Sequence, residues 1–215
     1  MTDRRSLTGT GPGETPAALL KKIGAAAAAG ADWIQIRERD LSGKDCSSLT
    51  REALERAAKV AEGTGKPPRI IVNDRLDVAL TEGAGGVHLG EKSLPVEEAK
   101  RLVSACRGAR VFLIGVSCHS LEAAKAAASG RADYLFFGPV FATPSKSAFG
   151  TPQGLERLAE VCRAVSLPVF AIGGVTLENA SSCLAAGASG IAAIRLFQDA
   201  EDIAALVQAL RKMAA

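Results

Sequence analysis

The chain has 215 residues, of which 47% are hydrophobic, and it carries a formal net charge of +3 at pH 7. This length favours a single domain with a substantial core, although it is short for an eight-unit α/β barrel. The lysines and arginines are dispersed, which argues against a nucleic-acid-binding protein and suits small phosphorylated substrates. No apolar run reaches ~18 residues and the N-terminus does not resemble a signal peptide, so we expect a cytoplasmic protein that does not enter a membrane. Five separate cysteines without a C-x-x-C pair argue against a disulfide framework.

The beginning of the chain carries no strand pattern. Residues 1–16 are polar and contain three glycines and two prolines. We therefore expect residues 1–16 to form an irregular N-terminal segment and residues 17–215 to form one domain. A helix is predicted over residues 16–29.

The stretch from Trp33 to Arg39 is the most informative part of the chain. Ile34 and Ile36 alternate with polar side chains, and this period of two indicates a β-strand. Strands of a parallel sheet are covered on both faces and normally read as apolar runs, so a buried Arg37 needs a partner. That partner is either an anionic ligand or an internal salt bridge.

The same pattern of a strand followed by a helix recurs along the rest of the chain. Strands are predicted over residues 69–72, 86–89, 111–116, 134–137, 168–172 and 190–194, and helices over residues 45–62, 75–82, 95–104, 121–129, 155–165, 176–186 and 200–212. Seven repeats without a change of composition leave a doubly wound sheet or a (β/α) barrel. Similar turns before three strands favour the barrel, and the absence of G-x-G-x-x-G weakens a nucleotide-binding alternative.

Polar residues gather where the predicted strands end, which is where the sites of barrels lie. This set consists of Gln35, Arg37, Arg39, Asn73, Asp74, His88, Ser117, His119, Thr143, Ser145, Lys146, Gly173, Gly174 and Arg195. It supplies cations, hydrogen-bond donors and a carboxylate, so it indicates a site for a phosphorylated ligand.

Each of these residues also has a structural interpretation. Gly173-Gly174 after an apolar strand can bring backbone N–H groups close to an anion, or can form a plain left-handed turn. Asp74 is a candidate Mg²⁺ ligand, or only a turn residue. His88 is a ligand contact or a satisfied core histidine, and Lys146 belongs to a lid loop or is solvated. Cys118 and His119 are neighbours in sequence, which makes them a poor nucleophile–base pair.

Taken together and in order, these motifs resemble the thiamine phosphate synthase family and its sister thiazole tautomerases. The resemblance runs from about Gly30 to Phe197. It is carried by Gln35-Ile36-Arg37, Asn73-Asp74, Gly86-Val87-His88-Leu89-Gly90, Gly115-Val116-Ser117-Cys118-His119-Ser120, Ala132-Asp133-Tyr134, Gly138-Pro139-Val140-Phe141, Thr143 with Lys146, and Ala171-Ile172-Gly173-Gly174-Val175. It implies a TIM (β/α)₈ barrel. Family members begin with an apolar strand that ends in Thr-Asp, and Met1-Thr2-Asp3-Arg4 resembles only the tail of that strand, so we expect a truncated first strand.

The resemblance also implies a reaction. The synthase joins hydroxymethylpyrimidine diphosphate to thiazole phosphate, and releases diphosphate and thiamine phosphate, in an Mg²⁺-dependent transfer. Diphosphate leaves first, and the thiazole nitrogen attacks the pyrimidine carbocation, so positioning and electrostatics matter more than a base. By match, Arg37, Asn73 and Lys146 hold the diphosphate and Asp74 the Mg²⁺, Gln35 and Ser117 contact the pyrimidine, and Thr143 and Gly174 contact the thiazole phosphate. The catalytic set is Arg37, Lys146 and Ser117, and the full substrate-binding set is Gln35, Arg37, Arg39, Asn73, His88, Ser117, Thr143, Ser145, Lys146, Gly173, Gly174, Ile194 and Arg195.

The chain departs from the family pattern at four places. Arg39 stands where Lys is usual, Ala142-Thr143-Pro144-Ser145-Lys146 replaces P-T-x-T-K, and Arg195 stands where Ser is common. At Ser93 the second Mg²⁺ carboxylate of the family is missing, so Ser93 is a doubtful metal ligand and weaker Mg²⁺ binding is expected. A thiazole tautomerase and a non-catalytic binder of thiamine-related phosphates are the alternatives, and Pro139 stands where the tautomerases use a His. A homo-oligomer is left open.

Overall fold

The structure, a computed structural model, describes residues 1–7, 15–64, 66–106, 111–143 and 151–214. The chain forms two compact units. Unit 1 comprises residues 1–87, 109–112 and 194–209, and unit 2 comprises residues 88–108, 113–193 and 210–215. We describe each unit by itself.

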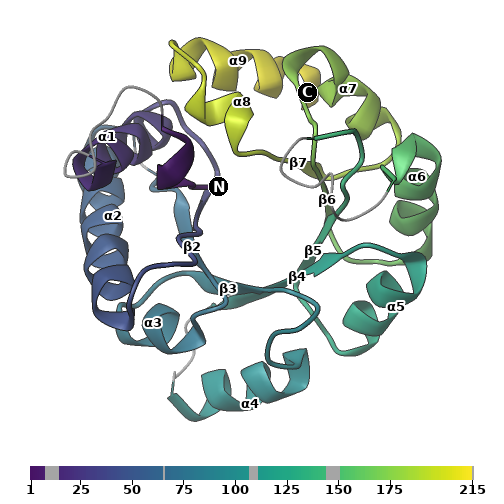
Figure 1. Cartoon of the computed structure of the whole chain (residues 1–215), viewed down its shortest axis with the longest axis horizontal. Helices are drawn as coiled ribbons and strands as arrows, with labels where there is room; N and C mark the ends of the chain where they lie inside the picture. The colour runs from purple at the N-terminus through teal and green to yellow at the C-terminus, as the bar shows by residue number, and fades with distance from the viewer. Residues whose placement is uncertain (8–14, 65, 107–110, 144–150, 215) are drawn as a thin grey trace. The chain divides into compact units, whose positions relative to one another are not determined.

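The described residues alternate between strands and helices along the chain (Figure 1). Unit 1 contains the 3-10 helix η1 (Arg4–Ser6), α1 (Thr15–Ala28), β1 (Trp33–Ile36), α2 (Gly43–Thr64), β2 (Arg69–Asn73), α3 (Leu76–Thr81) and α8 (Arg195–Gln198). Unit 2 contains α4 (Val96–Cys106), β4 (Leu113–Cys118), α5 (Leu121–Ser129), β5 (Tyr134–Phe137), α6 (Gly154–Ala164), β6 (Val169–Ile172), α7 (Leu177–Ala185) and β7 (Gly190–Ala192). The unit boundaries fall within β3 (Gly86–Leu89) and α9 (Ile203–Ala214).

The strands are parallel wherever their register is defined, and the strand order of the sheet is the chain order, β1 to β7. In unit 1, Ile34 of β1 lies opposite Ile70 of β2. In unit 2, β5 pairs with both β4 and β6, so that Phe136 lies opposite Ser117 on one side and Phe170 on the other. Parallel neighbours connected by helices form a TIM-barrel-like α/β fold. The prediction of the fold class is confirmed.

The core of unit 1 lies between two helices and the strands that they cover. Leu19, Leu20 and Ile23 of α1 pack with Ile34 and Ile36 of β1, and the buried face of α2 joins them. Figure 1 shows α1 and α2 side by side. The apolar residues of each helix recur at helical spacing, which is why one face of each is buried.

Unit 2 has a core of its own. Leu158 and Val161 of α6 and Ala180 and Cys183 of α7 are buried against apolar strand residues such as Leu135. The short β5 is buried at all four positions. Because both faces of β5 are covered, it reads as a continuous apolar run in the sequence.

The N-terminal segment is bound along the end of β1. The backbone N–H of Thr2 donates to the carbonyl oxygen of Gln35 at 2.8 Å, and the N–H of Arg37 donates to Thr2 Oγ1 at 2.9 Å. Arg4 forms ion pairs with Glu38 at 3.0 Å and with Asp40. The described part of this segment, residues 1–7, contains η1 and no strand, as the truncated first strand predicts. Residues 8–14 lie outside the described residues, and the division at residue 16 stays a prediction.

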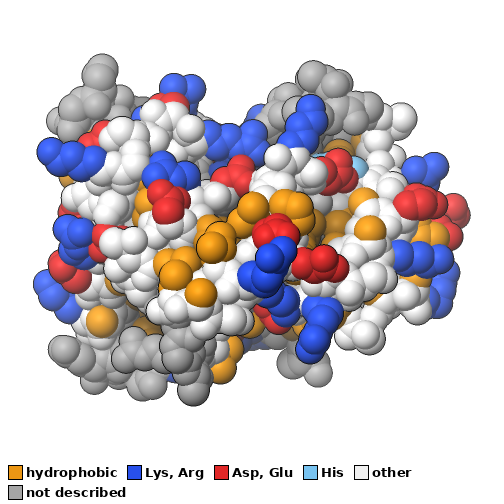
Figure 2. Space-filling model, turned by 90° about the horizontal axis from the view of Figure 1, so that it is seen from below, with side chains coloured by type: hydrophobic (Ala, Val, Ile, Leu, Met, Phe, Trp, Pro, Cys, Tyr) orange, Lys and Arg blue, Asp and Glu red, His pale blue; other side chains and the backbone are white. Residues whose placement is uncertain are grey.

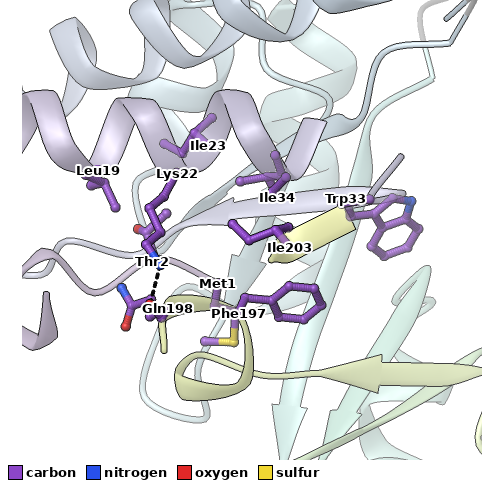
Figure 3. A pocket seen from close by; sticks show the side chains of 12 residues that line it. Met1, Thr2, Leu19, Lys22, Ile23, Trp33, Ile34, Phe197, Gln198 and Ile203 are labelled. Atoms are coloured by element: carbon purple, nitrogen blue, oxygen red, sulfur yellow. Dashed lines mark hydrogen bonds between the residues drawn. The ribbon is translucent and has the colours of Figure 1, made fainter. Parts of the chain in front are cut away.

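An apolar cavity of about 70 Å³ lies beside this segment. Met1, Ile34, Phe197 and Ile203 line it, and Lys22 reaches from α1 to donate to the carbonyl oxygen of Gln198 (Figure 3). This pocket is partly open to solvent, and the side chains that line it make fewer van der Waals contacts with protein atoms than fully packed ones do. The packing beside β1 is therefore incomplete.

Filling this cavity should stabilise the protein. Ala26 of α1 lines the cavity, and Ala26→Met adds a flexible apolar side chain that can occupy it. We expect the free energy of unfolding in urea to rise by about 1 kcal/mol. Ala17→Met, on the exposed face of the same helix, is the control and should change it by less than about 0.5 kcal/mol. Equal effects of the two substitutions would mean that the cavity is irrelevant to stability.

The observed elements differ from the predicted ones mainly at their ends. The strand predicted through Arg39 ends at Ile36, because the chain turns there and Leu41 N–H bonds to the carbonyl of Glu38 at 3.2 Å. The last strand ends at Ala192 instead of residue 194, and a helix that the sequence did not predict, α8, follows it. Arg195 is therefore the first residue of α8 and not the end of a strand.

Two further findings concern the surface. Figure 2 shows Lys and Arg side chains interspersed with Asp and Glu over the visible face, with no large block of one charge. Among the described helices, none combines the length and the apolarity that crossing a membrane requires.

Candidate active site

Unit 1 contributes a buried amide at the end of β1. Gln35 is 4% exposed, and its Nε2 donates to Asn73 Oδ1 of β2 at 3.4 Å. Gln35 Oε1 is buried and has no hydrogen-bond partner among the described residues. A buried acceptor without a donor is costly, so it points to a ligand that supplies an N–H or O–H.

Arg37 follows β1 and is half-buried. Burial lowers the pKa of Arg37, and the neighbouring charge of Arg39 lowers it further, while Asp3, Glu38 and Asp74 oppose this. In the described ranges no ion pair includes Arg37. The internal salt bridge is therefore not observed, and a half-buried guanidinium without an ion pair favours an added anion.

The amino group of Met1 shares this environment. Burial, and secondarily the charge of Arg37, lower the pKa of the Met1 amino group from 8.0 to about 6. The folded protein thus gives up this proton more easily than the unfolded chain does. The positive charge of Arg37 therefore disfavours a second cation beside it.

This pKa predicts a stability that depends on pH. Between pH 6 and 8 the unfolded chain binds more protons at Met1 than the folded one, so the free energy of unfolding should rise with pH across this window, by roughly 2 kcal/mol. Urea denaturation at pH 6 and pH 8 measures this difference. The control is the same chain with Met1 acetylated, in which the dependence should shrink. An unchanged dependence after acetylation would assign it to other groups.

Asp74 lies in a tight turn at the end of β2. Its backbone has φ +63°, and the N–H of Arg75 donates to the carbonyl oxygen of Asn73 at 2.7 Å, which closes a three-residue turn around Asp74. Turns with a positive φ at the central residue are rare and strained, and such strain often occurs at functional sites. Asp tolerates this region better than most residues. The turn exposes the Asp74 side chain at the strand end.

The metal-binding prediction fits only in part. Asp74 offers one exposed carboxylate, and Mg²⁺ accepts one or two carboxylates together with phosphate oxygens and water. Ser93 is engaged in its own loop, where its Oγ accepts the N–H of Gly90 at 2.8 Å. Glu91 accepts the backbone N–H of His119 at 3.2 Å. The described residues contain no group of three metal-ligating side chains, so a metal here would depend on substrate oxygens.

Unit 2 contributes a buried histidine with two hydroxyl partners. His88 is 2% exposed, with Nε2 2.8 Å from Ser117 Oγ and Nδ1 3.1 Å from the hydroxyl of Tyr134. The ring of Phe136 lies 4.1 Å from the His88 ring, centroid to centroid. These contacts fix the orientation of the imidazole. His88 is thus a satisfied buried histidine that also touches a predicted substrate-binding residue.

Gly173 and Gly174 form a close turn after β6. Both have positive φ, +91° and +65°, and a Cβ on Gly173 would come within 2.6 Å of Pro139. Asn179 Nδ2 donates to the carbonyl of Gly174 at 3.0 Å, and its Oδ1 accepts the N–H of Thr176, the N-cap of α7, at 2.9 Å. The left-handed turn is therefore present, and it leads directly into a helix N-terminus. Such ends bind anions.

The neighbouring Cys118 and His119 do not form a catalytic pair. Burial raises the pKa of the Cys118 thiol to about 12, so the thiol stays protonated. His119 Nδ1 contacts the carbonyl oxygen of Gly138. Thiol catalysis is excluded for this pair.

The remaining predicted residues are less well placed. Thr143 is half-buried at the end of the described loop after β5, while Ser145 and Lys146 lie outside the described residues. Ile194 is the N-cap of α8, and Arg39 and Arg195 are exposed. Among the predicted site residues, Gln35 and Asn73 are hydrogen-bonded in unit 1, and His88 and Ser117 are hydrogen-bonded in unit 2.

Three residues that support the site were missed from the sequence. Tyr134 binds His88, and Gly115, which lies opposite Tyr134 in the sheet, leaves room for its ring. A Gly opposite an aromatic residue in the neighbouring predicted strand is a signal that could have found this pair. Glu38, 8% exposed, was also overlooked, and its partner Arg4 lies too far away in sequence to be predicted.

Comparisons with known proteins identify the family of the chain. The family model described as "Thiamine monophosphate synthase" matches residues 8–197. The chain belongs to this family. A thiamine-phosphate synthase of Methanoculleus marisnigri is 46% identical over 187 residues, which cover 86% of this chain and 83% of that protein. That of Roseiflexus sp. is 40% identical over 215 residues, covering 100% of this chain and 84% of that one.

A solved structure agrees with this membership. The thiamine phosphate pyrophosphorylase of Pyrococcus furiosus superposes with a TM-score of 0.80 at 32% identity, covering 99% of this chain and 92% of that one. A 3-hexulose-6-phosphate synthase, at 20% identity and a TM-score of 0.62, shares the fold alone. The resemblance inferred from the motifs is confirmed.

Proposed function

We propose that the chain is a thiamine-phosphate synthase, which joins hydroxymethylpyrimidine diphosphate to thiazole phosphate and releases diphosphate. Family membership over residues 8–197 supports this transferase activity. The observation in the site that carries the proposal is the buried Gln35 Oε1, which lacks a donor among the described residues. The exocyclic amino group of the pyrimidine is a donor of the right chemistry.

The neighbours of Gln35 supply what the diphosphate needs. Arg37 is a half-buried cation without an ion pair among the described residues, and Asn73 next to Gln35 offers amide donors. When the diphosphate leaves, negative charge builds on its bridging oxygen, and a fixed guanidinium stabilises that charge more than it stabilises the bound substrate. Lys146 would add a second cation. No general base is required, because the thiazole nitrogen attacks with its own lone pair.

Mg²⁺ is the proposed cofactor, and Asp74 would hold it. A bound Mg²⁺ neutralises diphosphate charge and makes it a better leaving group. The turn around Asp74 keeps its carboxylate exposed at the strand end, where substrate oxygens and water could complete six ligands. Ser93, bonded to Gly90, would not substitute for a second carboxylate.

The thiazole phosphate would bind at the turn of Gly173 and Gly174. Without side chains, these residues allow a phosphate close to the backbone, and α7 begins just after them. Thr143 is a second candidate contact. The proposed surroundings are the cytoplasm, and a homo-oligomer stays a prediction that size-exclusion chromatography with light scattering would test.

The role of Gln35 gives the test of this proposal. Binding of hydroxymethylpyrimidine diphosphate and of an analogue with hydrogen in place of the amino group is measured by calorimetry. The wild type should prefer the amino compound by roughly 10-fold or more, because a buried acceptor is otherwise left unpaired. Gln35→Leu should remove the preference, and Arg56→Ala, at an exposed position of α2, should keep it. Equal affinity of the wild type for both compounds would refute the assignment.

A further inference from the structure

Three side chains of unit 2, those of Tyr134, His88 and Ser117, form a continuous hydrogen-bonded network. The Tyr134 hydroxyl lies 3.1 Å from His88 Nδ1, and His88 Nε2 lies 2.8 Å from Ser117 Oγ. Tyr134 is fully buried, whereas Ser117 is partly exposed at the strand end. This hydrogen-bonded network therefore extends from the buried Tyr134 to the partly exposed Ser117 at the candidate site.

The backbone of the neighbouring strand β4 leaves room for the Tyr134 ring. Gly115 lies opposite Tyr134, and a Cβ on Gly115 would come within 2.0 Å of Tyr134 Cζ. Phe170 packs edge-on against Tyr134, with the ring centroids 5.8 Å apart. The Tyr134 ring is therefore fixed between Gly115 and Phe170, and this holds its hydroxyl within hydrogen-bond distance of His88 Nδ1.

The protons of this network have two alternative arrangements, set by the tautomer of His88. A buried phenol must place its proton on an acceptor, and burial raises the pKa of Tyr134 further, so it remains protonated. A neutral imidazole has one donor and one acceptor nitrogen. If Tyr134 donates to Nδ1, the imidazole proton sits on Nε2 and donates to Ser117 Oγ. Ser117 must then direct its own proton away from His88, towards the site.

We propose that Tyr134 is a positioning residue, which fixes the Nε2–H tautomer of His88 so that Ser117 presents a hydroxyl proton to an acceptor atom of the ligand. This inference rests on the proposed function only for the identity of the ligand. The acceptor is then a nitrogen or oxygen atom of a substrate. In the opposite tautomer, Ser117 would donate to Nε2 and offer the ligand only lone pairs.

The first test reads the tautomer directly in the free protein. NMR of protein labelled with ¹⁵N in histidine should show a protonated Nε2 and an unprotonated Nδ1 for His88, assigned by comparison with His88→Gln. In Tyr134→Phe, which keeps the ring and removes the hydroxyl, part of the population should shift to the Nδ1–H tautomer. A wild-type proton on Nδ1, or a tautomer unaffected by Tyr134→Phe, would overturn the proposal.

The second test uses catalysis and a double-mutant cycle. Tyr134→Phe should lower kcat/KM for the pyrimidine substrate by roughly 10- to 100-fold, the usual effect of a lost buried hydrogen bond. If Tyr134 acts through Ser117, adding Tyr134→Phe to Ser117→Ala should cost little more than Ser117→Ala alone. Additive losses would mean that Tyr134 merely supports the fold. Because the NMR test needs no substrate, an inactive wild type with the expected tautomer would refute the proposed function and leave this inference standing.

Discussion

Replacing Arg37 by alanine is expected to lower kcat/KM for the pyrimidine diphosphate by about 10³-fold, the order of a lost charge-assisted contact to a leaving group. The same substitution should leave the free energy of unfolding unchanged or raise it slightly. The reason is that Arg37 is half-buried, its pKa is lowered by burial and by Arg39, and it forms no ion pair within the described residues. If Arg37 binds substrate without stabilising the free protein, its removal changes activity and leaves stability intact.

Matched variants make the Arg37 result interpretable. Arg39→Ala removes an exposed charge from the same stretch and should cost only roughly 10-fold, since exposed charges are screened. Arg37→Lys should recover part of the activity, because it restores charge but not the planar guanidinium. Steady-state kinetics and urea denaturation are measured for each. A destabilised Arg37→Ala protein that still binds diphosphate normally would show that Arg37 is structural.

Loss of the Asp74 carboxylate should affect Mg²⁺ dependence most strongly. We expect Asp74→Asn to reduce activity by about 10³-fold at limiting Mg²⁺ and to be partly rescued by excess Mg²⁺. Asn is the right replacement, because it tolerates the positive φ of residue 74, whereas Ala would add about 1 kcal/mol of backbone strain.

A complementary variant tests the missing second carboxylate. Ser93→Asp should let the enzyme saturate at a lower Mg²⁺ concentration than the wild type, which we expect to saturate only at high Mg²⁺. Activity is titrated against Mg²⁺ for all three proteins, and the unfolding of each is compared as a control. An Asp74→Asn protein with wild-type Mg²⁺ dependence would remove Asp74 from the metal site.

The sequence predicted the repeat of strands and helices well because each element carries its own periodicity. β3, β5 and α5 have the predicted bounds, since apolar runs and the N-cap Ser120 mark them locally. The predicted ends of β1 and β7 were wrong because the chain leaves the sheet directly after Ile36 and Ala192. Arg4 binds Glu38 and Asp40 beyond β1, and the unpredicted α8 redirects the chain after β7.

The candidate site was predictable as a set of residues but not as a set of contacts. The positions of Gln35, Asn73, His88 and Ser117 at strand ends followed from the parallel topology. Side-chain packing decides that the Gln35 oxygen has no partner among the described residues and that Tyr134 binds His88, and no local pattern encodes such packing.

The most direct test of the proposed function is turnover by the wild-type chain. Purified protein is incubated with hydroxymethylpyrimidine diphosphate, thiazole phosphate and graded Mg²⁺, and thiamine phosphate and diphosphate are quantified together. We predict equal amounts of the two products, formed only when both substrates are present. Binding of both substrates without formation of thiamine phosphate at any Mg²⁺ concentration would contradict the synthase assignment and indicate a non-catalytic binder.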